Sequence, residues 1–218
     1  MKLVLLGPSG AGKGTQAKYL SKAYDIPHIS TGDILRGHIT RETEIGRQIE
    51  HIMDTGKLVS DEIVIDLVKE RITEPDCAKG FILDGFPRNL YQAKVLRKMP
   101  VDIDRVICIR LDDDIIINRM SGRFSCPVCG AVYHTDHYPP KDNGNCDSCG
   151  NGLIQREDDK ASTVANRLKI YHDMTEPIID FYSEVGLLSE IDGLGCAEDI
   201  SGQIMEILKG ELTAWASL

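Results

Sequence analysis

Short apolar runs alternate with longer amphipathic stretches along most of this chain. Continuous apolar runs of this length are typical of buried parallel strands, and they predict strands at residues 3–6, 26–29, 81–83, 105–109 and 188–191. The stretches between them carry apolar residues at helical spacing. They predict helices at residues 13–24, 34–39, 44–54, 63–72, 89–98, 112–120, 161–182 and 198–209, with Pro177 interrupting the long one. This alternation predicts an α/β fold in which helices cover both faces of a parallel sheet.

The alternation stops at residues 122–159, where Gly, Pro, Asn, Asp and Cys dominate. Two CxxC pairs in this segment have the spacing of a tetrahedral four-thiolate zinc site; they are Cys126, Cys129, Cys146 and Cys149. Such a closed site leaves no position for a catalytic water, so the metal is expected to be structural. Free thiols or a disulfide pair are the alternatives, and His134 and His137 are expected at the surface. The segment is therefore predicted to be a small inserted module folded around Zn²⁺.

The bulk composition is that of an ordinary globular protein. The chain has 218 residues, of which 42% are hydrophobic and 27% charged, enough for one core with a small insertion. We see no apolar run long enough for a membrane span and no signal peptide, so we expect a cytoplasmic protein. In that compartment the seven cysteines are not expected to form a disulfide framework.

The net charge limits the classes of partner that the chain is expected to bind. A formal net charge of −9 argues against nucleic-acid and membrane-surface binding. An acidic chain that binds anions must gather its positive charge locally, which directs attention to the positions of its arginines.

A glycine-rich loop at residues 7–15, GPSGAGKGT, joins the first predicted strand to the first predicted helix. Glycines let backbone N–H groups curl around an anion, and Lys13 adds a full positive charge. This context predicts a P-loop that binds a nucleoside triphosphate. Gly14 occupies the position where most P-loops carry the Ser or Thr that ligates magnesium, and Thr15 comes one place later. The alternative is a glycine-rich turn that binds nothing.

The predicted strand at residues 81–83 is followed directly by Asp84. A carboxylate at the end of a hydrophobic strand is typical of P-loop enzymes, where it lies near the magnesium–nucleotide. An isolated acid at a strand end is as readily a turn residue. Beside a P-loop we favour a role in holding magnesium-bound water.

Two classes of function fit these features: a phosphotransferase whose zinc module is a lid, and a zinc-ribbon module fused to a nucleotide-binding switch. The second class needs a basic, aromatic surface around the knuckles, whereas the charged residues between Cys126 and Cys149 are mostly acidic. Basic residues instead flank the module, where hinge motion can swing them onto phosphates; they are Arg119, Arg123, Arg156 and Arg167.

Several motifs along the chain are specific in combination, and the resemblance that they carry extends from residue 1 to about residue 210. They are GPSGAGKGTQ, ISTGDILR, DGFPR followed by Gln92, SGR before the knuckles, and QREDD followed by Thr163, Arg167 and Leu168. With these motifs the chain resembles the adenylate kinases, of the long-lid, zinc-containing bacterial type. The order Gly14–Thr15 is normal in that family.

The resemblance implies an enzyme that reversibly transfers the γ-phosphoryl group of Mg-ATP to AMP, giving two ADP. It implies a monomer with a P-loop NTPase-type core, built on a five-stranded parallel sheet and formed by residues 1–30, 60–121 and 160–218. Residues 31–59 are expected to form the AMP-binding helical segment and residues 122–159 the zinc-binding lid. Asp158 and Asp159 are expected at the lid hinge, holding arginines.

The resemblance also implies the site residues, position by position. The ATP-binding residues are expected to be Gly10, Ala11, Gly12, Lys13, Gly14, Thr15, Arg119, Arg123, Val132, Tyr133 and Gly195. The AMP-binding residues are expected to be Thr31, Arg36, Lys57, Leu58, Val59, Gly85, Phe86, Pro87, Arg88, Gln92, Arg156 and Arg167. Catalysis is assigned to Lys13, Arg88, Arg123, Arg156, Arg167 and Asp84, with Asp33 as a second candidate beside Asp84 for Mg²⁺.

Alternatives to these assignments remain at this point. Gln92 outside its motif is typical of a solvent-facing helix residue, and a single arginine is typical of a solvated surface charge. A nucleoside monophosphate kinase with another acceptor, or with GTP as donor, is the rival enzyme.

Overall fold

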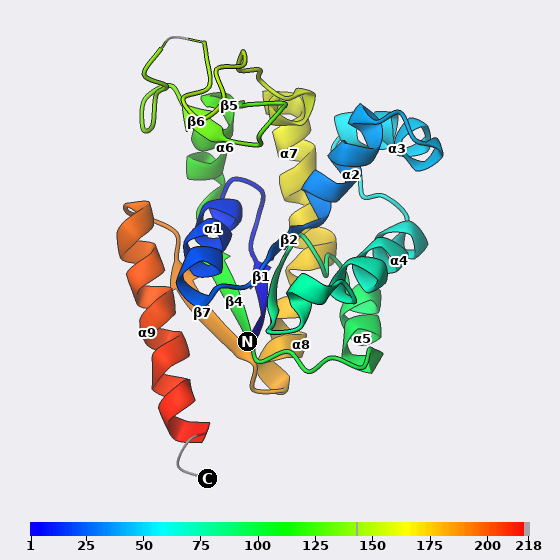
Figure 1. Cartoon of the computed structure of the whole chain (residues 1–218), viewed down its shortest axis with the longest axis vertical. Helices are drawn as coiled ribbons and strands as arrows, with labels where there is room; N and C mark the ends of the chain where they lie inside the picture. Colours follow the sequence, from blue (N-terminus) through cyan, green and yellow to red (C-terminus); the bar gives the residue numbers. More distant parts are fainter. Residues whose placement is uncertain (143, 216–218) are drawn as a thin grey trace.

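The computed structural model describes residues 1–142 and 144–215, with only the backbone for residues 211–215. Five strands form a wholly parallel sheet in the order β2-β3-β1-β4-β7 (Figure 1). Their bounds are β1 (Lys2–Leu6), β2 (His28–Ser30), β3 (Phe81–Asp84), β4 (Arg105–Arg110) and β7 (Leu188–Asp192). Position 143 of the expected lid and positions 216–218 of the expected core lie outside the described residues.

Helices cover both faces of this sheet, because successive strand residues point to opposite sides. Val4 and Leu6 of β1 pack with helices α4 (Asp61–Ile72), α5 (Leu90–Lys98) and α8 (Pro177–Glu184). Leu3 and Leu5 pack on the other face with α1 (Lys13–Tyr24) and α9 (Ala197–Trp215). The predicted α/β fold is thus confirmed, and the buried central strand β1 fixes where the glycine loop emerges.

Two smaller units project from the core (Figure 1). One is the helix pair α2 (Thr31–Thr40) and α3 (Glu44–Asp54), which packs closely where a Cβ at Gly46 would lie 2.2 Å from the His38 carbonyl oxygen. The other follows α6 (Asp113–Ser121) and contains the antiparallel pair β5 (Arg123–Ser125) and β6 (Val132–His134). It returns through a 3₁₀ turn (Glu157–Asp159) to α7 (Ala161–Ile170), which packs against α6.

The helix predicted at residues 161–182 is divided earlier than expected. Helix α7 ends at Ile170, a π-helical turn covers Tyr171–Thr175, and α8 begins at Pro177. Proline removes a helical N–H and its ring clashes with the preceding turn, so the bonding widens ahead of it: Glu176 N–H donates to the Tyr171 carbonyl oxygen at 2.8 Å. The widened turn brings Thr175 onto the core side, where its hydroxyl donates to the Arg88 carbonyl oxygen at 2.8 Å.

Other boundaries differ slightly from the predictions. Strand β2 covers 28–30 rather than 26–29, and a short 3₁₀ helix, Pro75–Cys77, precedes β3. Cys108 is fully buried in β4, as predicted for a core thiol. Among the described residues, no helix combines the length and apolarity that crossing a membrane requires.

The sheet should lose most stability from a cavity near its centre. Leu83→Ala removes a fully buried side chain of β3 and should lower the free energy of unfolding by about 2–5 kcal/mol, measured by urea denaturation. Leu90→Ala is the matched control, because Leu90 is 38% exposed and its loss should change that energy by no more than about 0.5 kcal/mol. Equal effects of the two substitutions would contradict this description of the core.

Candidate functional site

The loop between β1 and α1 lies at the carboxyl edge of the sheet. Gly7 has φ +133°, and a Cβ there would lie 2.5 Å from the Ile109 carbonyl oxygen, so the close approach requires glycine. The Lys13 ammonium donates to the carbonyl oxygens of Gly7 at 2.8 Å and Pro8 at 2.9 Å. The loop thus holds a cation at the positive N-terminus of α1, which is an arrangement suited to phosphate.

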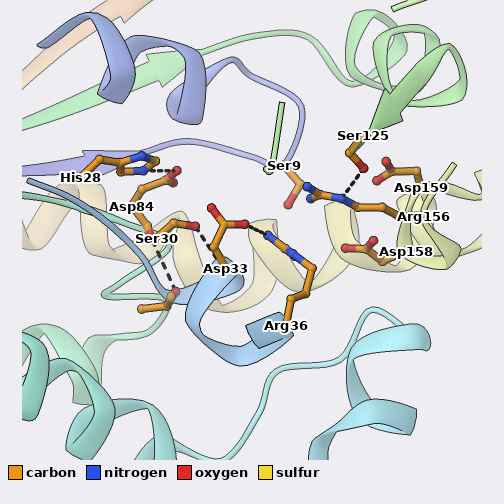
Figure 2. A network of polar contacts seen from close by, with 12 residues as sticks. Ser9, His28, Ser30, Asp33, Arg36, Asp84, Ser125, Arg156, Asp158 and Asp159 are labelled. Atoms are coloured by element: carbon orange, nitrogen blue, oxygen red, sulfur yellow. Dashed lines mark hydrogen bonds and ion pairs between the residues drawn. The ribbon is translucent and has the colours of Figure 1, made fainter. Parts of the chain in front are cut away.

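Asp84 lies beside this loop, on the strand adjacent to β1 and in register with Leu5. A Cβ at Gly14 would lie 3.5 Å from Asp84 Oδ2, so the carboxylate faces the first turn of α1. The same oxygen lies 3.2 Å from His28 Nε2 (Figure 2). Burial opposes ionisation, but the His28 hydrogen bond and the charge of Lys13 outweigh it and hold the pKa of Asp84 below its ordinary value.

Cations crowd around the same edge. Burial lowers the pKa of Lys13 to about 8, and repulsion from Arg88 and Arg167 adds to the effect. Burial also lowers the pKa of Arg88 to about 10, followed in importance by repulsion from Arg167. Arg156 is similar: burial lowers its pKa to about 10, and repulsion from Arg36 and Arg123 contributes. These shifts mark positive charges that are placed unfavourably for the protein alone and favourably for an anion.

Carboxylates at the base of the projecting module partly neutralise these cations. Arg123 forms a two-pronged ion pair with the buried Asp159, with Nε at 2.7 Å from Oδ2. Arg167 pairs with Asp158 and donates through Nη2 to Ser9 Oγ of the glycine loop at 2.6 Å. Burial opposes ionisation of Asp158, but the charge of Arg167, with smaller contributions from other arginines, lowers its pKa below the ordinary value. The base of the module and the loop are therefore joined through Arg167.

Helix α2 lies opposite this base. Figure 2 shows Asp33 and Arg36 of α2 between the His28–Asp84 pair and the module residues Ser125 and Arg156. Asp33 and Arg36 form an ion pair, and the Ser30 hydroxyl caps α2 by accepting from Asp33 N–H at 3.2 Å. Arg156 Nε donates to Ser125 Oγ at 2.7 Å, which leaves the other guanidinium nitrogens for further contacts.

Two adjoining pockets open at this edge. The first is lined by residues of α2, the end of α3 and the segment after it, the β3–α5 loop, α5, and the base of the projecting module. These residues include Thr31, Gly32, Leu35, Arg36, Met53, Gly56, Lys57, Leu58, Val59, Gly85, Arg88, Gln92, Asp158 and Arg167. The second is lined by the glycine loop, including Gly7, Ser9 and Lys13, and by Pro87. Arg88 and Arg167 line both pockets, so two ligands bound side by side would share them.

Gln92 lines the first pocket and is 2% exposed, so it is not the solvent-facing helix residue of the alternative interpretation. Its amide oxygen accepts from Arg88 N–H at 2.7 Å and its amide nitrogen donates to Asp61 Oδ1 at 2.7 Å. Thr31 is also buried, and its hydroxyl donates to the Gly85 carbonyl oxygen at 3.0 Å.

Some residues that were expected to contact a nucleotide have side chains that are buried or hydrogen-bonded within the protein. Tyr133 is 3% exposed in the small core of the module, and its hydroxyl accepts from Asp147 N–H at 2.8 Å. Phe86 is fully buried in the core cluster that contains Val4 and Leu83. These two residues can offer a ligand only their backbone. Val132 is exposed, and Arg119 Nη2 donates to the Gly193 carbonyl oxygen at 3.1 Å, close in sequence to the exposed Gly195.

The four predicted cysteines converge, and among the described residues they form the one group of His, Cys and acidic side chains with metal-ligand proximity. Their sulfur atoms lie within 4.8 Å of one another. Cys126 and Cys149 sulfurs are 3.4 Å apart and Cys129 and Cys146 sulfurs 3.5 Å apart, so no disulfide joins them. Gly130 and Gly150 close the two knuckles in left-handed backbone, with φ +69° and +73°. Four thiols with this spacing and convergence suit a tetrahedral zinc ion.

Three residues that act through other residues carry no local signal in the sequence. Ser9 was read only as part of the glycine loop, and Thr175 lies in the unexpected π-helical turn. Asp61 lies just before the helix predicted at residues 63–72 and belongs to none of the motifs. Each makes its contact across a long sequence separation, and no local pattern reports such a contact. His134 is half-buried rather than at the surface, and its Nδ1 accepts from the N–H groups of Asp136 and His137.

Comparison with known proteins gives a consistent result. The family model described as adenylate kinase matches residues 5–187. A protein named Adenylate kinase from Caldicellulosiruptor bescii is 52% identical over 213 residues, covering 96% of this chain and 98% of that protein. Proteins of the same name from Lachnospira eligens and Syntrophobacter fumaroxidans are each 50% identical over 212 residues, covering 95% of this chain and all of each relative.

The lowered pKa of Lys13 leads to a proton-uptake prediction. At pH about 8.5 a group with a pKa of about 8 has lost much of its charge, and a bound phosphate favours the charged form and raises the pKa. Binding of ADP should therefore take up a fraction of a proton, measured by calorimetry in buffers of different ionisation enthalpy. Uptake should vanish near pH 6, where Lys13 is already charged.

Lys13→Arg is the control, because arginine keeps the charge and does not titrate in this range. Equal proton uptake by this variant and the native chain at pH about 8.5 would contradict the assignment to Lys13.

Proposed function

Because the chain belongs to the adenylate kinase family, we propose that it reversibly transfers the terminal phosphoryl group of Mg-ATP to AMP, giving two ADP. The observation that carries the proposal is the pair of adjoining pockets, one at the glycine loop and one at α2, with Arg88 and Arg167 lining both. Transfer requires two phosphates in line and close together. Shared cations at the junction are suited to that arrangement.

We assign the donor to the glycine loop and the acceptor to the first pocket. ATP phosphates would bind to the N–H groups of residues 10–15 and to Lys13, and the adenosine would lie near Arg119, the backbone of Val132 and Tyr133, and Gly195. AMP would bind between Thr31, Arg36, the 57–59 stretch and the β3–α5 loop, with Gln92 at its base. These assignments rest on the lining of the two pockets and on the family motifs.

The chemistry needs charge neutralisation and positioning more than covalent participation by the protein. Lys13 and four arginines (Arg88, Arg123, Arg156 and Arg167) would surround the transferring group from the loop, the acceptor pocket and the lid base. The lowered pKa values of Lys13, Arg88, Arg156 and Arg167 accord with this role, because a phosphate would relieve the repulsion among the cations. Asp158 and Asp159 hold Arg167 and Arg123 in orientation.

Magnesium would be held through water rather than by the loop, because Gly14 offers no side-chain ligand. Asp84 fits such a site: its carboxylate faces the first turn of α1 and its pKa is held low. Asp33 is the second candidate, although it already pairs with Arg36. When bound, Mg²⁺ supplies positive charge at the β- and γ-phosphates.

Residues 122–159 would act as a lid and residues 31–59 as the mobile acceptor segment, with the remaining parts of the chain as the core. Closure would bring Arg123 and Arg156 onto the phosphates and exclude water, which suppresses hydrolysis of ATP. A cytoplasmic location and a monomeric state remain predictions.

A coupled assay tests the reaction directly. ATP with AMP should give ADP at a rate far above that of ATP alone, and AMP should exceed UMP, CMP and GMP as acceptor. Replacing ATP by GTP tests the donor in the same assay. Turnover with UMP equal to that with AMP would favour a different monophosphate kinase. ATP binding without ADP formation would favour a zinc-ribbon nucleotide switch.

We assign Zn²⁺ to the four cysteines, as a structural ion. Purified protein should contain about one zinc per chain, and Cys146→Ser should lose it and unfold at a lower temperature, because metal binding contributes to folding of the lid. Cys196→Ser is the matched control, since Cys196 is an exposed cysteine outside the cluster. Less than about half an equivalent of zinc in the native protein, or full metal retention by Cys146→Ser, would contradict the assignment.

A further inference from the structure

The amide of Gln92 is fixed at both ends by groups of opposite hydrogen-bonding character. Its oxygen accepts from Arg88 N–H at 2.7 Å, and its nitrogen donates to Asp61 Oδ1 at 2.7 Å. A backbone N–H can only donate, and an ionised carboxylate can only accept. The two partners therefore permit one orientation of the amide. Rotation by half a turn would set two donors against each other at Arg88 and two acceptors against each other at Asp61.

Asp61 is itself held in place. It is the first residue of α4, where the helix N-terminus favours a carboxylate. Its Oδ1 also accepts from Asn89 Nδ2 at 2.8 Å, and Asn89 in turn caps α5 by accepting from Gln92 N–H at 2.9 Å. Asp61, Asn89, Gln92 and the Arg88 N–H thus form a largely buried network. The network joins α4 to α5 beside the first pocket, which Arg88 and Gln92 line. A network whose members are all satisfied is rigid and keeps its polarity.

The fixed amide retains one N–H and one oxygen lone pair for a ligand. A 6-aminopurine such as adenine presents an amino donor beside the N1 acceptor, which matches that pair. A 6-oxopurine such as hypoxanthine presents an oxygen acceptor beside an N1–H donor, which is the reverse pattern. To accept a 6-oxopurine the amide would have to rotate against both of its partners.

We propose that Asp61 is a positioning residue that sets the polarity of the Gln92 amide and so selects a 6-aminopurine over a 6-oxopurine as the phosphoryl acceptor. This inference rests on the proposed function and on the acceptor base lying against Gln92. Asp61 acts through Gln92, and a site built to match one hydrogen-bonding pattern rejects the opposite one strongly, because buried groups are left unpaired.

The test is the ratio of kcat/KM for AMP to that for IMP, with ATP as donor, in the native chain and in Asp61→Asn. Asparagine can turn either its oxygen or its amino group toward Gln92, so it removes one of the two restraints and leaves that of Arg88. The AMP-to-IMP ratio should fall by about tenfold, which corresponds to about 1.4 kcal/mol of discrimination. Asp61→Ser is a second variant, because a hydroxyl also donates or accepts, and it should shift the ratio in the same direction.

Asp66→Asn is the matched control. Asp66 lies on the same helix, its side chain is 77% exposed, and its carboxylate lies 3.5 Å from the Lys69 ammonium. The Asp66→Asn substitution therefore removes the same charge from α4 without changing the contacts of Gln92. Its AMP-to-IMP ratio should equal that of the native chain.

The outcomes distinguish a failure of the proposed function from a failure of the role proposed for Asp61. If the native chain makes no ADP from ATP and AMP, the proposed function fails. If the native chain is active but the Asp61 variants lower both acceptors in parallel, with the ratio within twofold of native, Asp61 is merely structural and this inference is overturned.

Discussion

The structure is governed by the concentration of positive charge at one edge of the sheet in a chain that is acidic overall. Lys13 lines one of the two adjoining pockets, and Arg88 and Arg167 line both. Burial and mutual repulsion lower the pKa values of these groups. Such a cluster is unfavourable for folding and favourable for binding polyphosphate, which is the usual relation between stability and function at a preorganised site.

The surrounding fold makes this cluster possible. The parallel strands bring the loop after β1 and the carboxylate at the end of β3 to the same edge. Asp84 faces Gly14 of the P-loop, while Asp158 and Asp159 pair with Arg167 and Arg123 at the base of the projecting module. Among the described residues of the projecting module, the buried apolar cluster is small: Cys126, Tyr133 and Cys146, with Phe124, Ala131 and Leu153 partly buried against them. The proposed zinc ion would therefore stabilise this module independently of the sheet, as the proposed motion of a lid requires.

The parts predictable from sequence are those with local patterns. The strand–glycine–helix signature located the P-loop, the alternation of apolar runs predicted the parallel sheet, and the CxxC spacing predicted the convergence of the cysteines. Contacts between distant elements were not predictable in this way. The Asp61–Gln92 bond depends on how α4 packs against α5, and the π-helical turn depends on how Pro177 is accommodated. Burial of Tyr133 follows from the alternation of side chains along β6, and none of the motifs includes this strand.

The central claim is that the clustered cations bind phosphate and do not stabilise the fold. The substitution Arg88→Met tests this claim most directly. Methionine keeps much of the apolar stem and removes a charge that Arg167 repels. The account predicts that the ligand-free variant unfolds at an equal or higher denaturant concentration than the native chain. It also predicts that ADP formation from ATP and AMP falls by a factor of about 10² or more. A variant that lost stability but kept transfer within about tenfold of native would contradict the account.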